Sequence, residues 1–259
     1  KMISPGTVIV SAGGEVDNIR KVVSPVLCNK KHSTLYHIDF SFDELSLGGS
    51  AFAQSLNKIG DDVPTVKNPE YFRAAFNAVQ QLIKEGLVLS GHDISAGGLI
   101  TCLLEMCFSN TEGGLQINLD GFKGADLIHI LFAENPGIVI QVADEARSAM
   151  KSILDDAGVA FMKIGKPVDE RHILAKFQDK EYQFGIDYLR DVWYETSYVL
   201  DTQQSFNKQA LARFSNYKKQ PVEFKFNNDF TGKMSSYHIS ANRRTSTGIH
   251  AAIIREKGT

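Results

Sequence analysis

The sequence has 259 residues, of which 43% are hydrophobic and 22% are charged, and its formal net charge is -2. This composition is typical of a globular protein and fits one large domain or one domain with an extension. The small net charge argues against a nucleic-acid or anionic-membrane binder, and no apolar run approaches the ~20 residues that a membrane span requires.

Strand and helix patterns alternate along the first 165 residues. Before residue 87 the periodicity predicts a strand at 7–12, a short helix at 18–23, a strand at 34–40, a small-residue helix from Gly48 to near Gly60 and a helix at 68–86. The helix at 68–86 has the clearest pattern, because Asn68 and Pro69 form a typical helix start and Gly86 ends it. Gly48 and Gly49 could bring the backbone close to an anion, or they could serve tight packing of the helix on a sheet.

A glycine-rich motif at residues 91–98 lies between a short apolar strand and a helical pattern. At such a junction the pair Gly97 and Gly98 would let the backbone approach a ligand, and the first free N–H groups of the helix would face it. Asp93 and Ser95 add a hard oxygen ligand and a hydroxyl group, so the motif suits a phosphate with a divalent cation. The alternative is a polar turn in which Asp93 or Ser95 caps the helix and the glycines only break the strand.

The same alternation continues to residue 165. The expected elements are a strand at 87–90, helices at 97–108 and 126–132, strands at 115–119 and 138–142, an amphipathic helix at 144–157 and a strand at 160–165. In the amphipathic helix we expect Ala149, Ile153 and Leu154 to face inward. The whole pattern predicts an α/β fold with a mixed β-sheet flanked by helices, and the spacing leaves open how many strands are parallel.

After residue 165 the pattern changes. It predicts a hairpin at 172–184, a long helix at 186–202 that carries Trp193, Tyr194 and Tyr198, a helical segment at 207–217 and a polar linker at 218–247. Residues 250–255 have the pattern of a strand, but too few residues follow it to form the elements that would pack on it. We therefore expect this strand to be the first element of a truncated domain.

The three cysteines form no disulfide framework, and CxxC and HExxH spacings are absent, so we expect reduced thiols, no zinc and a cytosolic protein.

Several of these segments, in this order, resemble one known family. They are LGGSAFAQ at 47–54, the helix from Pro69, HDISAGGL at 92–99, LEMCF at 104–108, LFAE at 131–134, WYETSY at 193–198 and AIIREKG at 252–258. They are similar to the long, multidomain phosphoribosylformylglycinamidine synthase of purine biosynthesis, over nearly the whole chain. The His-Asp-x-Ser-x-Gly-Gly pattern also occurs in aminoimidazole ribonucleotide synthetase, selenophosphate synthetase and thiamine-phosphate kinase, whereas the aromatic linker and the final strand favour the long synthase.

The resemblance implies a ligase that forms a C–N bond with glutamine as the amido donor. The enzyme uses ATP to phosphorylate the amide oxygen of formylglycinamide ribonucleotide, and ammonia from glutamine then displaces the phosphate to give the amidine. Residues 1–168 would be the second α/β domain of the synthase core, 169–248 a hairpin, helices and linker, and 249–259 the first strand of a truncated glutaminase domain. The implied partners are the barrel domains, the first α/β domain and the glutaminase domain of the same cytoplasmic polypeptide.

The resemblance also assigns residues to an auxiliary site that keeps a nucleotide with magnesium. By this resemblance, Asp93 occupies the position of a magnesium (Mg2+) ligand in the family, and Ser95 occupies the position of a residue that contacts ATP. The other cofactor-binding candidates are Gly97, Gly98, Gly48 and Gly49. No catalytic residue is assigned, and the isolated chain is expected to be inactive because none of its cysteines lies in a glutaminase context. Ile94 and Ala96 stand where many relatives have Arg and Asp, which lowers the local charge.

Two other functions remain open from the sequence. The segment could be a purely structural or interaction domain of that enzyme, with no ligand of its own. It could also be a kinase-like member of the same superfamily, although the chain lacks a complete N-terminal ATP-binding half. Measurable binding of Mg-ATP by the isolated chain would distinguish a nucleotide-binding domain from a structural one.

Overall fold

The computed structural model describes residues 11, 13–16, 18–206, 208–219 and 225–240. The chain divides into two compact units, one of Val23–Glu223 and one of Lys1–Val22 with Phe224–Thr259. In the second unit a 3-10 helix at Ile19–Lys21 forms where a short helix is predicted, and a β-bridge joins Asn18 to Lys233. The strand expected at 250–255 lies outside the described residues, as does all but one residue of the strand expected at 7–12.

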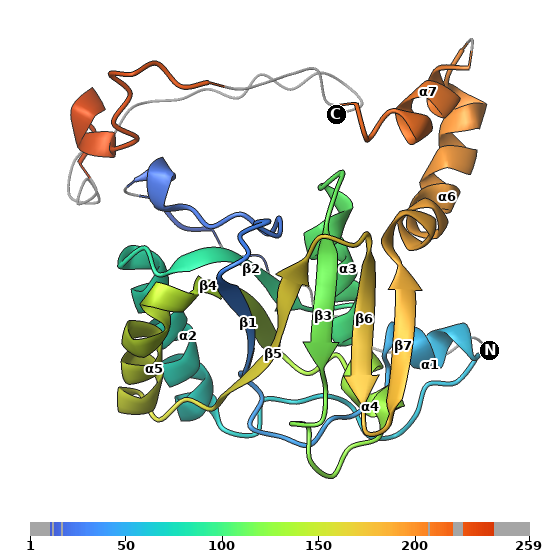
Figure 1. Ribbon diagram of the computed structural model, residues 1–259, viewed down its shortest axis with the longest axis horizontal. Coiled ribbons are helices and arrows are strands. Elements are labelled where there is room, and N and C mark those ends of the chain that lie inside the picture. The colour runs from blue at the N-terminus through green and yellow to red at the C-terminus, as the bar shows by residue number, and fades with distance from the viewer. Residues whose placement is uncertain (1–10, 12, 17, 207, 220–224, 241–259) are drawn as a thin grey trace. The chain divides into compact units, whose positions relative to one another are not determined.

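The larger unit is built on a mixed β-sheet, which confirms the predicted α/β class (Figure 1). Within the described residues seven strands lie in the order β2-β4-β1-β5-β3-β6-β7, and only β3 and β6 pair in parallel. Their bounds are β1 Ser33–Asp39, β2 Val88–Ile94, β3 Gly114–Asn118, β4 Gly137–Ala143, β5 Phe161–Val168, β6 His172–Phe177 and β7 Lys180–Gly185. The predicted hairpin is β6 and β7, so the sheet continues beyond residue 168, where the first domain is expected to end.

Helices cover both faces of this sheet. The helices of the larger unit are α1 Ala51–Ser55, α2 Pro69–Lys84, α3 Gly98–Phe108, α4 Leu127–Phe132, α5 Arg147–Asp156, α6 Ile186–Gln204 and α7 Gln209–Ser215, with a 3-10 turn at Asp144–Ala146 before α5. Helix α7 packs against α6. Figure 1 shows α2 and α5 side by side, whereas α3 packs against α4, β2 and α6. Within the described residues, no helix combines the length and apolar character that crossing a bilayer would demand.

Alternation along the strands divides the core into two clusters. In β1 the side chain of Leu35 lies in the cluster with α3 and α4, whereas Tyr36 and Ile38 lie in the cluster with α2 and α5. In β4, Val139 belongs to the first cluster and Ile140 to the second. This is the two-residue period of a strand that is buried on both faces, which explains why central strands read as continuous apolar runs.

Two helices differ from their predictions. In α5, Leu154 is buried and Ile153 is partly buried as predicted, but Ala149 is exposed and Met150 is buried instead, because Met150 lies one helical turn before both of them. The helix expected to reach Gly60 ends at Ser55, where the backbone turns back and the Lys58 N–H donates to the Ala53 carbonyl. The second difference concerns a helix end, which short-range patterns specify least.

Gln141 of β4 holds the strand that carries the glycine-rich motif. Its side chain is fully buried, and its Oε1 accepts hydrogen bonds from the Cys28 N–H and the Ser90 hydroxyl, each at 2.9 Å. Its Nε2 donates to the Cys28 carbonyl at 2.7 Å and to the Ser33 hydroxyl at 2.8 Å. All its donor and acceptor groups are therefore engaged, as a buried amide requires, and β1, β2 and β4 are tied together at this end of the sheet.

His37 of β1 should make the stability of the fold depend on pH. Burial lowers the pKa of His37 from 6.5 to about 4, although the charge of Asp39 acts in the opposite direction. The unfolded chain therefore binds a proton on this imidazole at a higher pH than the folded chain does, so stability should fall as the pH is lowered from about 6.5 to 4. Thermal unfolding midpoints of the wild type and His37→Gln across this range measure the effect, and parallel curves would contradict it.

Candidate functional site

The glycine-rich motif begins inside strand β2. The predicted strand ends at Ser90, whereas β2 continues to Ile94 because His92, Asp93 and Ile94 pair with β4. Ile94 is buried, while Asp93 and Ser95 are both exposed, and the Asp93 side chain is 74% accessible to solvent. This is the alternation expected if Asp93 and Ser95 project from one face of the chain.

The turn between β2 and α3 is made by glycines in the left-handed region. Gly97 has φ +87° and Gly98 has φ +72°, a region that other residues rarely adopt. Gly97 is the N-cap of α3, and no side chain forms a capping hydrogen bond there. The alternative in which Asp93 or Ser95 caps the helix is therefore wrong, and neither side chain is occupied in that way.

The amide groups of the four candidate glycines all donate within the protein. The Gly48 N–H donates to the Asp62 carbonyl at 2.7 Å, and the Gly49 N–H donates to the Ile59 carbonyl at 2.6 Å. The Gly98 N–H donates to the Ser95 carbonyl at 3.0 Å, and the Gly97 N–H donates to a side chain described next. In this conformation the N–H groups of these glycines are not free to donate to a ligand. A ligand could still lie against the backbone of these residues, because glycine has no side chain.

Glu134 joins the two glycine segments, a role that the sequence analysis missed. Its Oε1 accepts hydrogen bonds from the Gly97 N–H and from the Ala51 N–H at the start of α1, each at 2.8 Å. A carboxylate of the protein thus sits where positive backbone dipoles converge. The segment at 131–134 belongs to the resemblance, but nothing local in it indicates a contact with residues 37 and 83 positions away.

Close packing explains two of these glycines. A Cβ atom on Gly98 would lie 2.7 Å from the Leu131 carbonyl oxygen and from the backbone of Phe132, and one on Gly48 would lie 2.2 Å from the Asp62 carbonyl oxygen. The Phe132 ring stacks on Phe52 with 4.7 Å between ring centroids. Close approach of two backbone segments therefore accounts for both glycines, but Gly48 meets the loop at Asp62, so the predicted packing of its helix on a sheet is not what the structure shows.

His92 and Glu105 surround the base of Asp93. His92 Nδ1 lies 2.8 Å from the Asp93 carbonyl oxygen, and Nε2 lies 3.4 Å from Glu105 Oε2. Burial raises the pKa of Glu105, the neighbouring His92 lowers it, and the charge of Asp93 raises it further.

The exposed groups of this site can contribute one carboxylate and one hydroxyl. Across the described part of the chain, no three His, Cys, Asp or Glu side chains gather as a metal site. A magnesium ion held by Asp93 would therefore take its other ligands from phosphate oxygens, water or residues of other domains, which is usual for this ion. The residues present fit a partial nucleotide–magnesium site.

The family of the chain follows from its sequence. A profile described as "AIR synthase related protein, C-terminal domain" matches residues 35–176, from β1 to β6. The chain belongs to this family. The match includes the motif, Glu134 and the central strands, so the site lies within the family domain.

Curated relatives extend the similarity over nearly the whole chain. It is 32% identical to the probable phosphoribosylformylglycinamidine synthase, chloroplastic/mitochondrial, of Arabidopsis thaliana over 99% of this chain and 18% of the relative. It is also 32% identical to the human phosphoribosylformylglycinamidine synthase over 78% of this chain and 15% of the relative. These findings confirm the resemblance, and the chain spans less than a fifth of the length of these two relatives.

Solved structures share the fold. PurLQS from Thermotoga maritima aligns with a TM-score of 0.54 and 14% identity, covering 66% of this chain and 28% of that chain. T. maritima PurL complexed with ATP aligns with a TM-score of 0.52 and the same identity, covering 66% of this chain and 28% of that chain. At this identity the likeness establishes the fold, a mixed sheet with flanking helices.

Proposed function

We propose that this chain is part of a long phosphoribosylformylglycinamidine synthase and contributes Asp93 and Ser95 to a nucleotide–magnesium site. The observation that carries the proposal is the position of these side chains: both are exposed, Asp93 in the last paired residues of β2 and Ser95 directly after it, and neither caps α3. Support also comes from relatives with this name and from T. maritima PurL structures named as complexes with ATP, ADP and AMPPCP.

The whole enzyme would convert formylglycinamide ribonucleotide, glutamine and ATP into formylglycinamidine ribonucleotide. Because the chain spans a small share of its relatives, the barrel domains, the first α/β domain and the glutaminase domain would come from the same polypeptide. We keep the division into a second α/β domain at 1–168, a connecting region at 169–248 and a glutaminase strand at 249–259 as part of the proposal.

Three free cysteines support a reducing compartment, and we propose the cytoplasm.

Each residue would have a defined task. Magnesium would neutralise the charge of the phosphates when bound. Asp93 would supply a carboxylate oxygen to the metal, and the Ser95 hydroxyl would donate a hydrogen bond to a phosphate oxygen. Glu134 would hold the Gly97 turn in place, and His92 would orient Asp93 through its contacts with that residue's carbonyl and carboxylate oxygens.

Asp93→Asn should weaken magnesium-dependent nucleotide binding about tenfold, since the amide keeps an oxygen ligand but loses the negative charge that favours the metal. Isothermal titration with Mg-ATP, with and without a chelator, measures the effect in the chain and in the longer polypeptide. Glu181→Gln removes the same charge from an exposed position on β7 and should leave the affinity unchanged.

A structural domain without a ligand is the second candidate, because Glu134 occupies the N–H groups that an anion would otherwise meet. That function predicts equal nucleotide retention in the wild type and Asp93→Asn, with equal melting temperatures. Unchanged affinity in both the chain and the longer polypeptide would therefore favour the structural role over the nucleotide site.

A further inference from the structure

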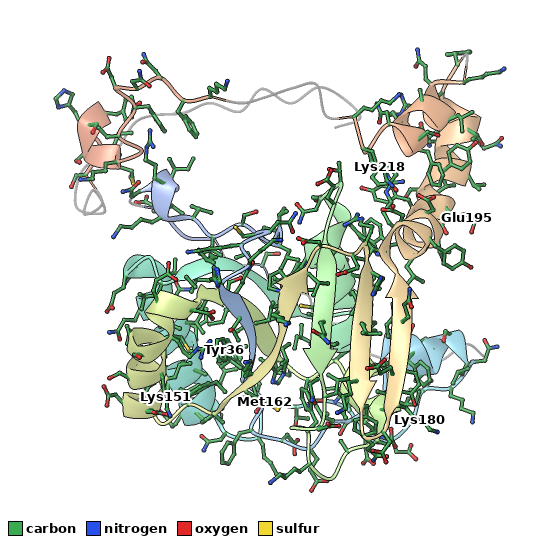
Figure 2. All side chains as sticks on the ribbon, viewed as in Figure 1. Tyr36, Lys151, Met162, Lys180, Glu195 and Lys218 are labelled. Atoms are coloured by element: carbon green, nitrogen blue, oxygen red, sulfur yellow. The ribbon has the colours of Figure 1, made fainter. Side chains whose placement is uncertain are left out.

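A pocket of about 760 Å³ lies apart from the glycine-rich motif, and no residue of 91–98 lines it. It is formed at the end of β1, the start of β5, the loop after β3 and the first turn of α4. Met162, labelled in Figure 2 near the start of β5, is one of its walls. Its volume is within the range of pockets that hold small organic ligands.

His37 brings hydrogen-bonding groups into this pocket. Its ring packs edge-on against Phe122, with 5.2 Å between ring centroids. Among the described residues, no side chain or backbone group forms a hydrogen bond with its ring nitrogens, so one N–H donor and one acceptor remain for a ligand. The lowered pKa noted above keeps this imidazole neutral at pH 7.

The remaining lining combines negative charge with flat apolar walls. Carboxylates of Asp39, Asp43, Glu44 and Asp126 line the pocket, against the single ammonium group of Lys123. Asp39, Asp43 and Asp126 already accept hydrogen bonds within the protein, whereas the described residues offer no such partner to the carboxylate of Glu44. The excess of carboxylates would repel phosphate or carboxylate ligands and attract a cation.

The apolar walls favour a ligand with a flat body. Phe122 and Met162 line the same pocket as the carboxylates, whereas the ring of Phe161, whose residue also borders the pocket, packs against Tyr36 on the other face of the sheet. Aromatic and thioether groups pack well against flat rings, and an aromatic face also attracts a cation. A ligand that satisfies both the walls and the charge is a flat organic cation with N–H donors.

We propose that this pocket binds a small aromatic cation of the amidine or amine class, with the Glu44 carboxylate and the His37 imidazole as its polar contacts. This site does not depend on the proposed nucleotide site, because the two share no residue. It would add a second ligand to the domain.

The test uses benzamidine as the cation and benzoate as its anionic counterpart. The histidine ring signals of the whole chain are followed by NMR during titration at pH 7, and His37→Gln assigns the signal of His37. Benzamidine should shift that signal in a saturable way, and benzoate should not. Glu44→Gln should weaken benzamidine binding at least fivefold, whereas Glu181→Gln, which removes an equal charge on β7, should change it less than twofold.

Three results would overturn the proposal: binding of benzoate as tight as that of benzamidine, unchanged benzamidine affinity in Glu44→Gln, or displacement of benzamidine by Mg-ATP. Displacement by Mg-ATP would make the pocket part of a nucleotide site. Glu44 is exposed and makes no side-chain hydrogen bond in the described structure, so its variant should fold even if His37→Gln does not.

Discussion

Replacing Gly98 with alanine is expected to lower the free energy of unfolding by about 4 kcal/mol. The added Cβ would lie 2.7 Å from backbone atoms of Leu131 and Phe132, which cannot move aside as a flexible side chain could. The backbone at this position also has φ +72°, which costs roughly 1–2 kcal/mol for a residue with a Cβ. Urea denaturation of the wild type and variant measures the difference.

Gly158→Ala is the matched control for this prediction. Gly158 has φ +65° at the end of α5, but no atom lies within 4 Å of the position of an added Cβ. Its alanine variant should therefore lose only about 1 kcal/mol, from the backbone conformation alone. Similar losses at both positions would show that contact between α3 and α4 does not require Gly98, and would leave the left-handed backbone conformation as the reason for the glycine.

The second large effect is expected for Arg171→Ala, at about 3 kcal/mol of unfolding free energy. Arg171 follows β5, and its NH1 donates to the carbonyl groups of Cys107 and Gly113, each at 3.1 Å. Its Nε donates to Asp187 Oδ1 at 3.0 Å, so one side chain ties the end of α3 to the start of α6. The Arg171 side chain is 17% exposed, and its loss would leave the Gly113 carbonyl without its donor and remove one of the donors to the Cys107 carbonyl, which also accepts from the Asn110 N–H.

Arg73→Ala provides the comparison, because Arg73 pairs with Glu70 on α2 and both side chains are more than 70% exposed. Such a surface pair should contribute less than about 0.5 kcal/mol. Lys218 also contacts Asp187, so Arg171→Lys should recover little of the loss if the two carbonyl contacts matter most. A full recovery in Arg171→Lys would instead assign the stabilisation to charge alone.

Local patterns were enough to predict most elements of the larger unit. Helix α2 follows its prediction within two residues, because Asn68 caps it and Gly86 follows its end, and both signals act over a few bonds. The hairpin of β6 and β7 was also predicted, but its place in the sheet was not. Parallel pairing of β6 with β3 joins residues about 58 positions apart, and no short-range pattern encodes that contact.

The sequence by itself determined the family, the α/β class and the candidate residues Asp93 and Ser95. The reason is that the residues of a motif and the periodic spacing of apolar residues can both be read from short stretches of the chain. Only the tertiary structure decided how the glycines are used. Glu134 reaches the Gly97 and Ala51 amides from a distant part of the chain, and α4 packs against Gly98. Such contacts depend on which segments the sheet brings together: β4 pairs with β2, and this pairing places Glu134, just before β4, close to Gly97, just after β2.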